Sequence, residues 1–191
     1  MKPLALLFFF ILPLAQLTAR DLPTIAAEVG EPVLQELMGG CSLKCAFPWE
    51  TAAVAPGKAA QPVYTLDDDD ASTAWIDTNN GVGTKLVFQF PKKLPKELNN
   101  TPFYGFDIVD GYIKSESLFK SYSRVKKAKL YYNGKPLYYV TFADTRRWQH
   151  VNFDDIEARE GDTFTIEIVE VYPGSKSPNV ALTEVVLQGA H

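Results

Sequence analysis

The sequence contains little cysteine and histidine. Among its 191 residues there are two cysteines, Cys41 and Cys45, and two histidines, His150 and His191. A structural zinc site usually takes about four such ligands. His150 lies in a strand-like segment, and no recognisable motif joins it to a serine or cysteine, so a packed or edge-strand histidine is the simpler interpretation. Composition therefore favours neither a zinc site nor nucleophilic catalysis.

A hydrophobic run long enough to cross a membrane is also lacking. The apolar stretch Leu4–Leu14 holds about 10 apolar residues, whereas a transmembrane helix needs about 20. It follows the positively charged Lys2 and leads to Ala19, a small residue suited to signal peptidase. No cysteine follows at the position where bacterial lipoproteins are acylated. These features predict a signal peptide over residues 1–19 and a secreted or periplasmic protein without a transmembrane anchor.

Basic residues are fewer than acidic residues. The chain has 19 basic and 23 acidic residues, a net charge of −4, and cleavage that removed Lys2 would leave 18 − 23 = −5. This balance argues against nucleic acid or an anionic membrane as a partner. The remaining 191 − 19 = 172 residues fit a single domain, whose usual size is about 50 to 200 residues. A second, catalytic module does not fit beside it.

Residues 20–60 are interpreted as an N-terminal extension of the domain. Apolar residues from Glu31 are spaced as in a helix, with Pro32 in its first turn and the glycines at 39–40 as a stop. The following Cys41 and Cys45 are predicted to form a disulfide, because an exported protein meets oxidising conditions. A metal site is the less favoured alternative for this pair.

Beyond Gln61 the apolar residues alternate with polar ones. Leu86, Phe88 and Phe90 share one face of a predicted strand. Asn133-Gly134 predicts a tight hairpin, because both residues tolerate positive φ, and a bulge is expected near Ile168. The other predicted strands are Val63–Leu66, Phe103–Val109, Val125–Tyr132, Leu137–Phe142, Trp148–Phe153, Phe164–Tyr172 and Val180–Leu187.

These segments predict an all-β fold for residues 61–191. Roughly eight short antiparallel strands without crossover helices indicate two sheets packed face to face, with a jelly roll as the preferred topology and one short N-terminal helix before it. No helical spacing is found after Gln61.

The most unusual local feature is a run of four aspartates, Asp67–Asp70, followed by Ser72, Thr73 and Trp75. Four adjacent carboxylates repel one another, and a calcium ion, which takes six to eight oxygen ligands, would relieve that repulsion. A solvated acidic turn explains the same residues equally well. Trp75 is interpreted as a packing anchor, because large aromatic residues directly after a turn usually pack inward.

This aspartate-to-tryptophan segment resembles the D-G-x-x-x-T-x-W signature of discoidin-like domains, also called galactose-binding-like or coagulation-factor type C domains. Within that family the chain is most similar to the glycan-binding, translocation-type domain attached to certain secreted bacterial NAD glycohydrolases. The paired cysteines are similar as well, so the resemblance covers roughly residues 41–189. It extends through Val109–Ser115, Ser123–Lys127, Val171–Lys176 and Leu182–Val185.

The resemblance implies a jelly-roll sandwich whose loops at one end form a shallow ligand site, often with a structural calcium. The calcium ligands implied here are Asp68, Asp70, Thr73 and Glu184. The signature glycine is replaced by Asp69, a residue type that reaches the left-handed conformation at some strain. The shape of this turn is the main departure from the family pattern.

Six residues are candidates for ligand contacts. Tyrosine rings can cover the apolar face of a sugar while basic side chains hydrogen-bond its hydroxyls. The alternative is that the tyrosines pack at strand ends and the basic residues are simply solvated. The six candidates are Tyr112, Lys114, Tyr122, Arg124, Tyr172 and Lys176.

The sequence thus predicts an exported, non-catalytic glycan-binding module. One rival is a protein–protein interaction module of the cell envelope that uses the same loops. The less favoured rival is a glycoside-type hydrolase, which would need two carboxylates facing each other across a cleft.

Overall fold

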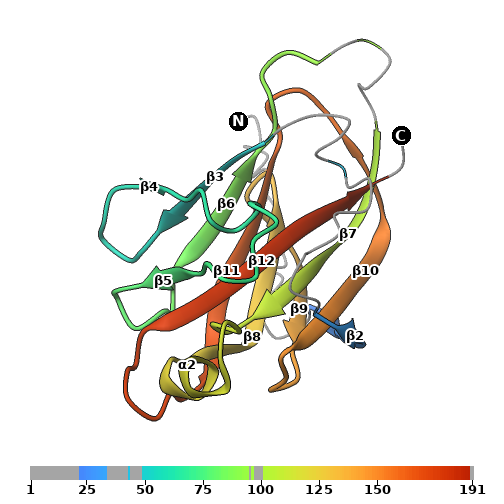
Figure 1. Ribbon diagram of the computed structural model, residues 1–191. Coiled ribbons are helices and arrows are strands. Elements are labelled where there is room, and N and C mark those ends of the chain that lie inside the picture. Colours follow the sequence, from blue (N-terminus) through green and yellow to red (C-terminus); the bar gives the residue numbers. More distant parts are fainter. Residues whose placement is uncertain (1–21, 34–42, 44–48, 95, 97–100, 190–191) are drawn as a thin grey trace, which may run out of the picture.

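The computed structural model describes residues 22–33, 43, 49–94, 96 and 101–189. These residues form two β-sheets packed face to face, as expected for an all-β sandwich (Figure 1). The strands are β1 (Thr24–Ala26), β2 (Glu28–Pro32), β3 (Glu50–Val54), β4 (Gln61–Pro62), β5 (Trp75–Asp77), β6 (Lys85–Gln89), β7 (Thr101–Asp110), β8 (Arg124–Tyr132), β9 (Lys135–Thr141), β10 (Arg147–Ala158), β11 (Thr163–Tyr172) and β12 (Val180–Gly189). The described helix is α2 (Glu116–Ser121).

The two sheets differ in size. The larger has seven strands in the order β1-β9-β8-β11-β6-β3-β4, and the smaller has five in the order β2-β10-β7-β12-β5. Pairing is antiparallel except between β1 and β9. Among the described residues, no helix is both long and apolar enough to pass through a membrane.

The predicted hairpin and bulge are confirmed. Asn133 and Gly134 have φ of 48° and 74° and connect β8 to β9, as a tight turn with two positive-φ residues requires. The register of β11 against β8 shifts between Ile168 and Val171. A bulge there places the apolar residues on both sides of it into the same core.

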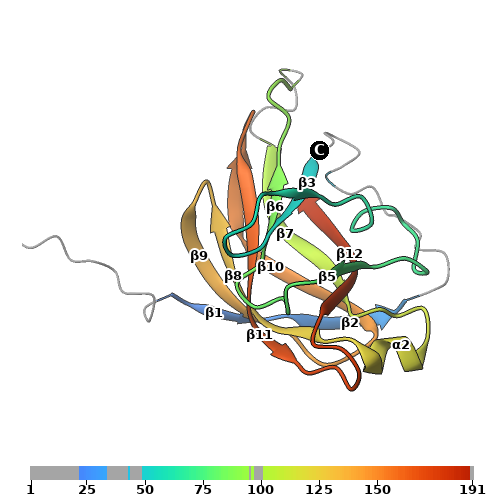
Figure 2. The same cartoon turned by 90° about the vertical axis from the view of Figure 1, so that its left-hand side faces the viewer.

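The region before Gln61 contributes more to the fold than the sequence indicated. β1 extends the seven-stranded sheet and β2 the five-stranded sheet, so one short segment runs along an edge of both sheets (Figure 2). Glu31 and Pro32, where a helix was predicted to begin, instead end β2. The rest of that prediction, beyond Val33, and the predicted disulfide between Cys41 and Cys45 lie outside the described residues.

Two further segments differ from expectation. Residues 63–66 are not a strand, since β4 is confined to Gln61–Pro62, although Val63 and Leu66 are buried. Helix α2 was not predicted. Its six residues are too few to give a periodic apolar pattern, and the remaining signal was Ser115, whose side chain accepts a hydrogen bond from the backbone N–H of Leu118 at 3.1 Å.

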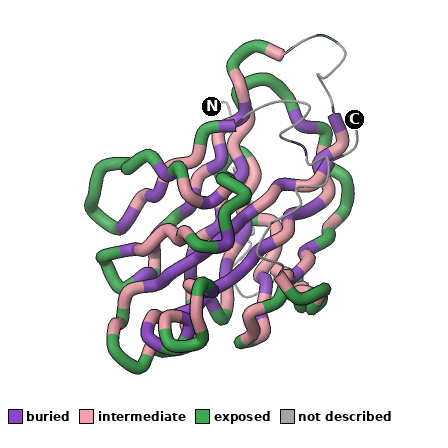
Figure 3. The backbone as a smooth tube through the Cα atoms, in the orientation of Figure 1, coloured by how far each residue is buried: buried purple, intermediate pink, exposed green. Residues whose placement is uncertain are grey.

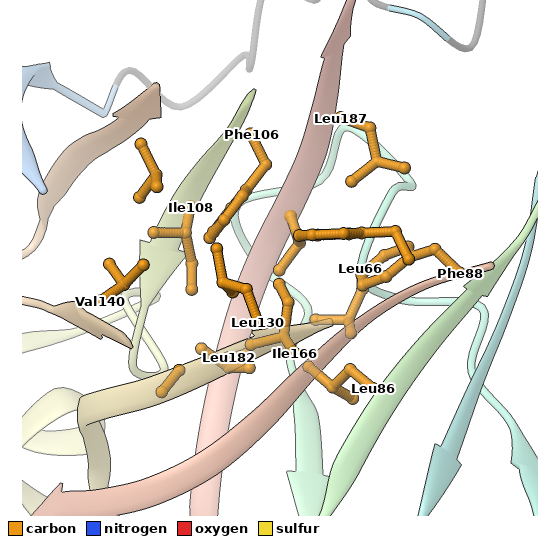
Figure 4. Packing of buried hydrophobic residues seen from close by; sticks show 14 of the residues in the cluster. Leu66, Leu86, Phe88, Phe106, Ile108, Leu130, Val140, Ile166, Leu182 and Leu187 are labelled. Atoms are coloured by element: carbon orange, nitrogen blue, oxygen red, sulfur yellow. The ribbon is translucent and has the colours of Figure 1, made fainter. Parts of the chain in front are cut away.

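The core lies between the sheets and follows the predicted alternation. Leu86, Phe88 and Phe90 are completely buried, as are Phe164 on the neighbouring β11 and Leu130 on β8 beyond it. Figure 3 shows buried residues along the strands and exposed residues in the connections, and Figure 4 shows Leu66 packing with residues of both sheets. A smaller apolar cluster, Ala71, Val109, Ile113 and Phe119, is separate from this core.

Candidate functional site

One end of the sandwich gathers most of the predicted site residues. Helix α2 and the β11–β12 connection lie together there (Figure 1). Backbone N–H groups of Ser175 and Lys176 donate to the carbonyls of Lys120 and Ser121, at 2.9 and 3.1 Å. We call this region the α2 end. Since its connections are bonded to one another through the backbone, they form a fixed platform.

Gly111 sets the direction in which the chain leaves β7. Its φ of +86° is in the left-handed region, and a Cβ atom there would lie 2.7 Å from the Phe119 ring. Both the conformation and the space therefore require glycine. The turn brings Tyr112 over the acidic segment, where its hydroxyl donates to the Ser72 carbonyl at 3.2 Å.

Tyr112 and Tyr122 are brought together. Their ring centroids are 6.2 Å apart and the planes are tilted by 44°. Both residues are half-buried, so part of each side chain remains accessible. Tyr122 is also the C-cap residue of α2, with its backbone N–H donating to Leu118 at 3.3 Å. We call these two residues the tyrosine pair.

Arg124 makes internal contacts, and its predicted role as a ligand contact stays a prediction. Its guanidinium donates to both carboxylate oxygens of Asp144, at 2.9 and 2.8 Å, and to the Tyr122 carbonyl at 2.7 Å. It also lies 4.9 Å over the Phe119 ring. Only 8% of the side chain is exposed. Arg124 therefore positions Tyr122 and does not offer its charge to solvent.

Asp110 is buried beneath the same end. One carboxylate oxygen accepts the Val125 N–H at 3.0 Å, and only 1% of the residue is exposed. Burial raises the pKa of Asp110 well above 3.8, against the lowering effect of the Val125 hydrogen bond and of Arg124. A hydrolase would place such an acid in a cleft facing a second one. Asp110 instead lies inside the fold.

Tyr172 and Lys176 are not brought to the tyrosine pair by any contact in the described part of the chain. The Tyr172 hydroxyl donates to the Phe142 carbonyl at 2.9 Å, which favours the packing interpretation for this residue. Lys176 is exposed on the β11–β12 connection.

A hollow of about 710 Å³ lies at the α2 end. This volume falls in the range of about 300 to 1,000 Å³ that is usual for small-ligand sites. We call it the terminal groove. Four segments line it with two residues each: Pro32 and Val33, Ala71 and Ser72, Ile113 and Lys114, and Arg146 and Arg147.

Lys114 is the one predicted ligand residue that lines the terminal groove. Arg146 and Arg147 were missed. Arg146 ends the β9–β10 connection and Arg147 begins β10. The two adjacent arginines were the available signal, but the sequence does not show which loop they face. Ser72, whose carbonyl holds Tyr112, links the groove to the tyrosine pair.

The acidic turn is well defined. Thr73 donates its hydroxyl to Asp68 at 2.8 Å, and Asp68 and Asp70 accept the N–H groups two residues ahead at 3.1 and 2.8 Å. A hydrogen bond from Ser72 is the main cause that lowers the pKa of Asp70. Asp69, which replaces the signature glycine, has a φ of 57°. The aspartate thus adopts the left-handed conformation that the signature requires.

Three of the four predicted calcium ligands, Asp68, Asp70 and Thr73, therefore gather in one turn. Glu184 is completely buried in β12, and its neighbour Val185 donates to the Leu66 carbonyl just before the turn at 2.7 Å. The described residues contain no group of three or more His, Cys, Asp or Glu side chains arranged to hold a metal ion. Calcium, which takes six to eight oxygens, would need backbone carbonyls or water in addition.

Trp75 is half-buried and packs against the main core, as predicted. It also lines a second hollow of about 430 Å³ beside β3 and β4, together with Asp77. The carboxylate of Asp77 accepts hydrogen bonds from the backbone and side chain of Asn79, at 2.8 and 3.1 Å. Asp77 thus stabilises the conformation of its own loop.

His150 lies on β10 near an edge of the five-stranded sheet. Its Nδ1 is 2.7 Å from Asp107, whose other carboxylate oxygen accepts from Gln188 at 2.8 Å. A Cβ atom on Gly30 of the edge strand β2 would lie 2.1 Å from the imidazole. These contacts match the predicted packed, edge-strand histidine.

Comparison with protein families gives one match. The family described as the NAD glycohydrolase translocation F5/8 type C domain matches residues 51–188. Because the match covers most of the 191 residues, the chain belongs to this family, as the sequence motifs indicated.

Solved structures with a similar fold include the CBM32-1 and CBM32-2 domains of ZmpB from Clostridium perfringens in complex with GalNAc. The TM-score is 0.53 and the identity 14%, covering 86% of this chain and 39% of that one. A structure that also contains the M60 catalytic domain gives 0.53 and 13%, covering 88% and 17%. This chain therefore spans well under half of either relative. No curated protein matches it at the level of these comparisons.

Proposed function

We propose that this protein is a module that binds a glycan at the α2 end without chemical turnover. The observation that carries the proposal is the hydrogen bond between Tyr112 and Ser72, because it fixes an aromatic ring beside the terminal groove that Ser72 lines. A tyrosine ring can cover the apolar face of a pyranose, and Lys114 can donate hydrogen bonds to its hydroxyls. The solved GalNAc complex of the CBM32 domains supports a carbohydrate as the ligand class.

The test is a glycan array followed by calorimetric titration of the best ligand. We expect the double substitution Tyr112→Ala and Tyr122→Ala to weaken binding about ten-fold or more, or about 1.4 kcal/mol. Tyr112→Phe, which keeps the ring but loses the hydrogen bond to Ser72, should weaken binding by less than the double substitution does. Tyr64→Ala is the matched control, because Tyr64 is 83% exposed and lies outside the groove. Unchanged binding by the folded double variant would contradict the proposal.

A protein-docking module remains the alternative. Such a surface usually has a contiguous apolar patch, whereas the large apolar side chains exposed in the described residues are Val29, Tyr64 and Val82, on three separate segments. The terminal groove therefore favours a small ligand. Binding of a purified glycan in the absence of any other protein distinguishes the two functions.

We also propose that a calcium ion binds at the acidic turn, with Asp68, Asp70, Thr73 and Glu184 as candidate ligands. A ligand that binds only the folded state stabilises it in proportion to RT ln(1 + [L]/Kd). The melting temperature should therefore be higher in excess calcium than after unfolding and refolding in excess chelator. Equal melting temperatures would count against the ion.

Export is proposed from the predicted signal peptide. Expression of the full chain in a secreting host should yield a mature protein that begins near Arg20, and N-terminal sequencing measures this directly. Retention of residues 1–19 on the exported protein would contradict it.

A further inference from the structure

The terminal groove has a charge opposite to that of the protein. The whole chain carries a net charge of −4, but the groove is lined by Lys114, Arg146 and Arg147, and no acidic residue is among its lining residues. Its remaining surface includes the apolar side chains of Val33 and Ile113. Positive groups beside apolar walls concentrate the electrostatic potential in a cleft. The groove is thus suited to a ligand that carries negative charge.

The two arginines are held in place before any ligand binds. Arg147 donates its Nε to the Gly30 carbonyl at 2.7 Å, and its backbone pairs with Pro32 of β2. Arg146 contacts Glu116 at 3.2 Å and also donates to the Ile113 carbonyl. Side chains that are already ordered lose less conformational entropy on binding.

This positive charge is only partly offset within the described part of the chain, where the Lys114 ammonium helps to lower the pKa of the nearby Asp70 carboxylate. Lys114 and Arg147 form no ion pair there, and Arg146 pairs only with Glu116, which is shared with Lys120. The Nε of Arg146 is buried and has no hydrogen-bond partner among the same residues. An anionic group in the groove would accept hydrogen bonds from the side chains of Lys114 and Arg147, and guanidinium groups bind carboxylate and sulfate oxygens through paired hydrogen bonds.

We propose that the terminal groove selects an acidic sugar, in which a carboxylate or a sulfate group is held by Lys114 and Arg147 with Arg146 beside them. This inference rests on the proposed glycan-binding function and specifies its ligand. It places the anionic group in the groove and the sugar ring toward the tyrosine pair.

Three sugars that differ at one carbon test the inference. Galactose, galacturonate and galactose 6-sulfate share a ring, and titration of the full chain measures the affinity for each. We expect one or both acidic sugars to bind at least about ten-fold more tightly than galactose at low salt, and the advantage to shrink at high ionic strength. The carboxylate and sulfate arms show which anion is preferred.

The variants Lys114→Gln and Arg147→Gln, combined, remove two charges and keep hydrogen-bonding side chains, including a donor near Gly30. They should reduce the affinity for the acidic sugar about ten-fold more than that for galactose. The matched control is Lys92→Gln with Arg159→Gln, one lysine and one arginine that are exposed and lie outside the groove.

Equal affinities for galactose and both acidic sugars would overturn the inference while leaving glycan binding intact. So would an acidic preference that the double glutamine variant retains. Failure to bind any glycan on the array would instead remove the proposed function, and the inference with it.

Discussion

The two ends of the sandwich are stabilised by different interactions. Opposite the α2 end, aromatic side chains pack around Phe103, whose ring lies 5.0 Å from Phe164, 5.1 Å from Phe153 and 5.9 Å from Phe90. At the α2 end, the buried groups include Asp110, Arg124, Ser123 and Thr183. Apolar packing needs only complementary shape, whereas buried polar groups must each find a partner. The aromatic end therefore contributes stability, and the α2 end fixes the positions of loops.

The strongest test of this contrast is Phe103→Ala. The ring is completely buried, so its removal leaves a cavity and should lower the free energy of unfolding by about 3 to 5 kcal/mol. Denaturation by urea measures the change. Tyr64→Ala, which removes an 83% exposed ring, should change stability by less than about 0.5 kcal/mol. If the two variants lost similar free energies of unfolding, the aromatic cluster would contribute no more to stability than an exposed ring does.

Asp144→Ala tests the polar end. The substitution leaves the Arg124 guanidinium, with 8% exposure, without its carboxylate. Because Asp144 itself is 38% exposed, we expect a loss of about 2 kcal/mol, less than for a fully buried pair. Binding to the preferred glycan should weaken as well, since Arg124 holds the Tyr122 carbonyl.

The control for Asp144→Ala is Glu157→Ala, which breaks the exposed ion pair with Arg159. Exposed pairs add little to stability, so this variant should unfold and bind as the wild type does. If a folded Asp144→Ala variant bound the glycan as tightly as the wild type, the contact between Arg124 and Asp144 would not be needed to position the binding residues.

Asp110 gives the polar end a pH dependence of its own. Because burial raises its pKa well above 3.8, the folded state holds a proton that the unfolded state releases. The contribution of Asp110 to stability should therefore fall as the pH rises from about 3.8 to the raised pKa, by up to about 1.4 kcal/mol per pH unit.

Asp110→Asn removes this titration. Urea denaturation across pH 4 to 7 should show the variant gaining stability relative to the wild type as the pH rises. The exposed Asp155→Asn is the control and should follow the wild-type curve. A constant difference between Asp110→Asn and the wild type would mean that Asp110 does not titrate as its burial requires.

The same contrast explains what the sequence could predict. Alternating apolar residues such as Leu86 and Phe88 mark a buried strand directly, so the late strands and the sandwich were predictable. The turn at Asn133 was predictable as well, because its conformation depends on local residue types. The short strands β1 and β2 were not, because their stability comes from pairing with β9 and β10, far along the chain.

The candidate site was predicted only in part for a related reason. The sequence indicated that Tyr112, Lys114 and Tyr122 lie on connections, and the structure brings Tyr112 and Tyr122 together and places Lys114 in the adjoining groove. It could not show that Arg124 turns inward to Asp144, because that contact joins residues 20 apart in the chain. Nor could it place Arg147 in the terminal groove, since its position depends on the pairing with β2.

The smallest expected effect concerns helix α2, where two serines allow a matched comparison. Ser115 is the N-cap, and its side chain accepts the Leu118 N–H at 3.1 Å, so Ser115→Ala should cost about 1 kcal/mol. Ser117 is exposed within the helix, where alanine has the higher helix propensity. Ser117→Ala should therefore be neutral or slightly stabilising. Tyr122 is the C-cap residue of α2, so loosening the first turn should weaken glycan binding only if the helix holds Tyr122 in place. Equal affinities in both serine variants would show that the first turn of α2 is not needed to position Tyr122.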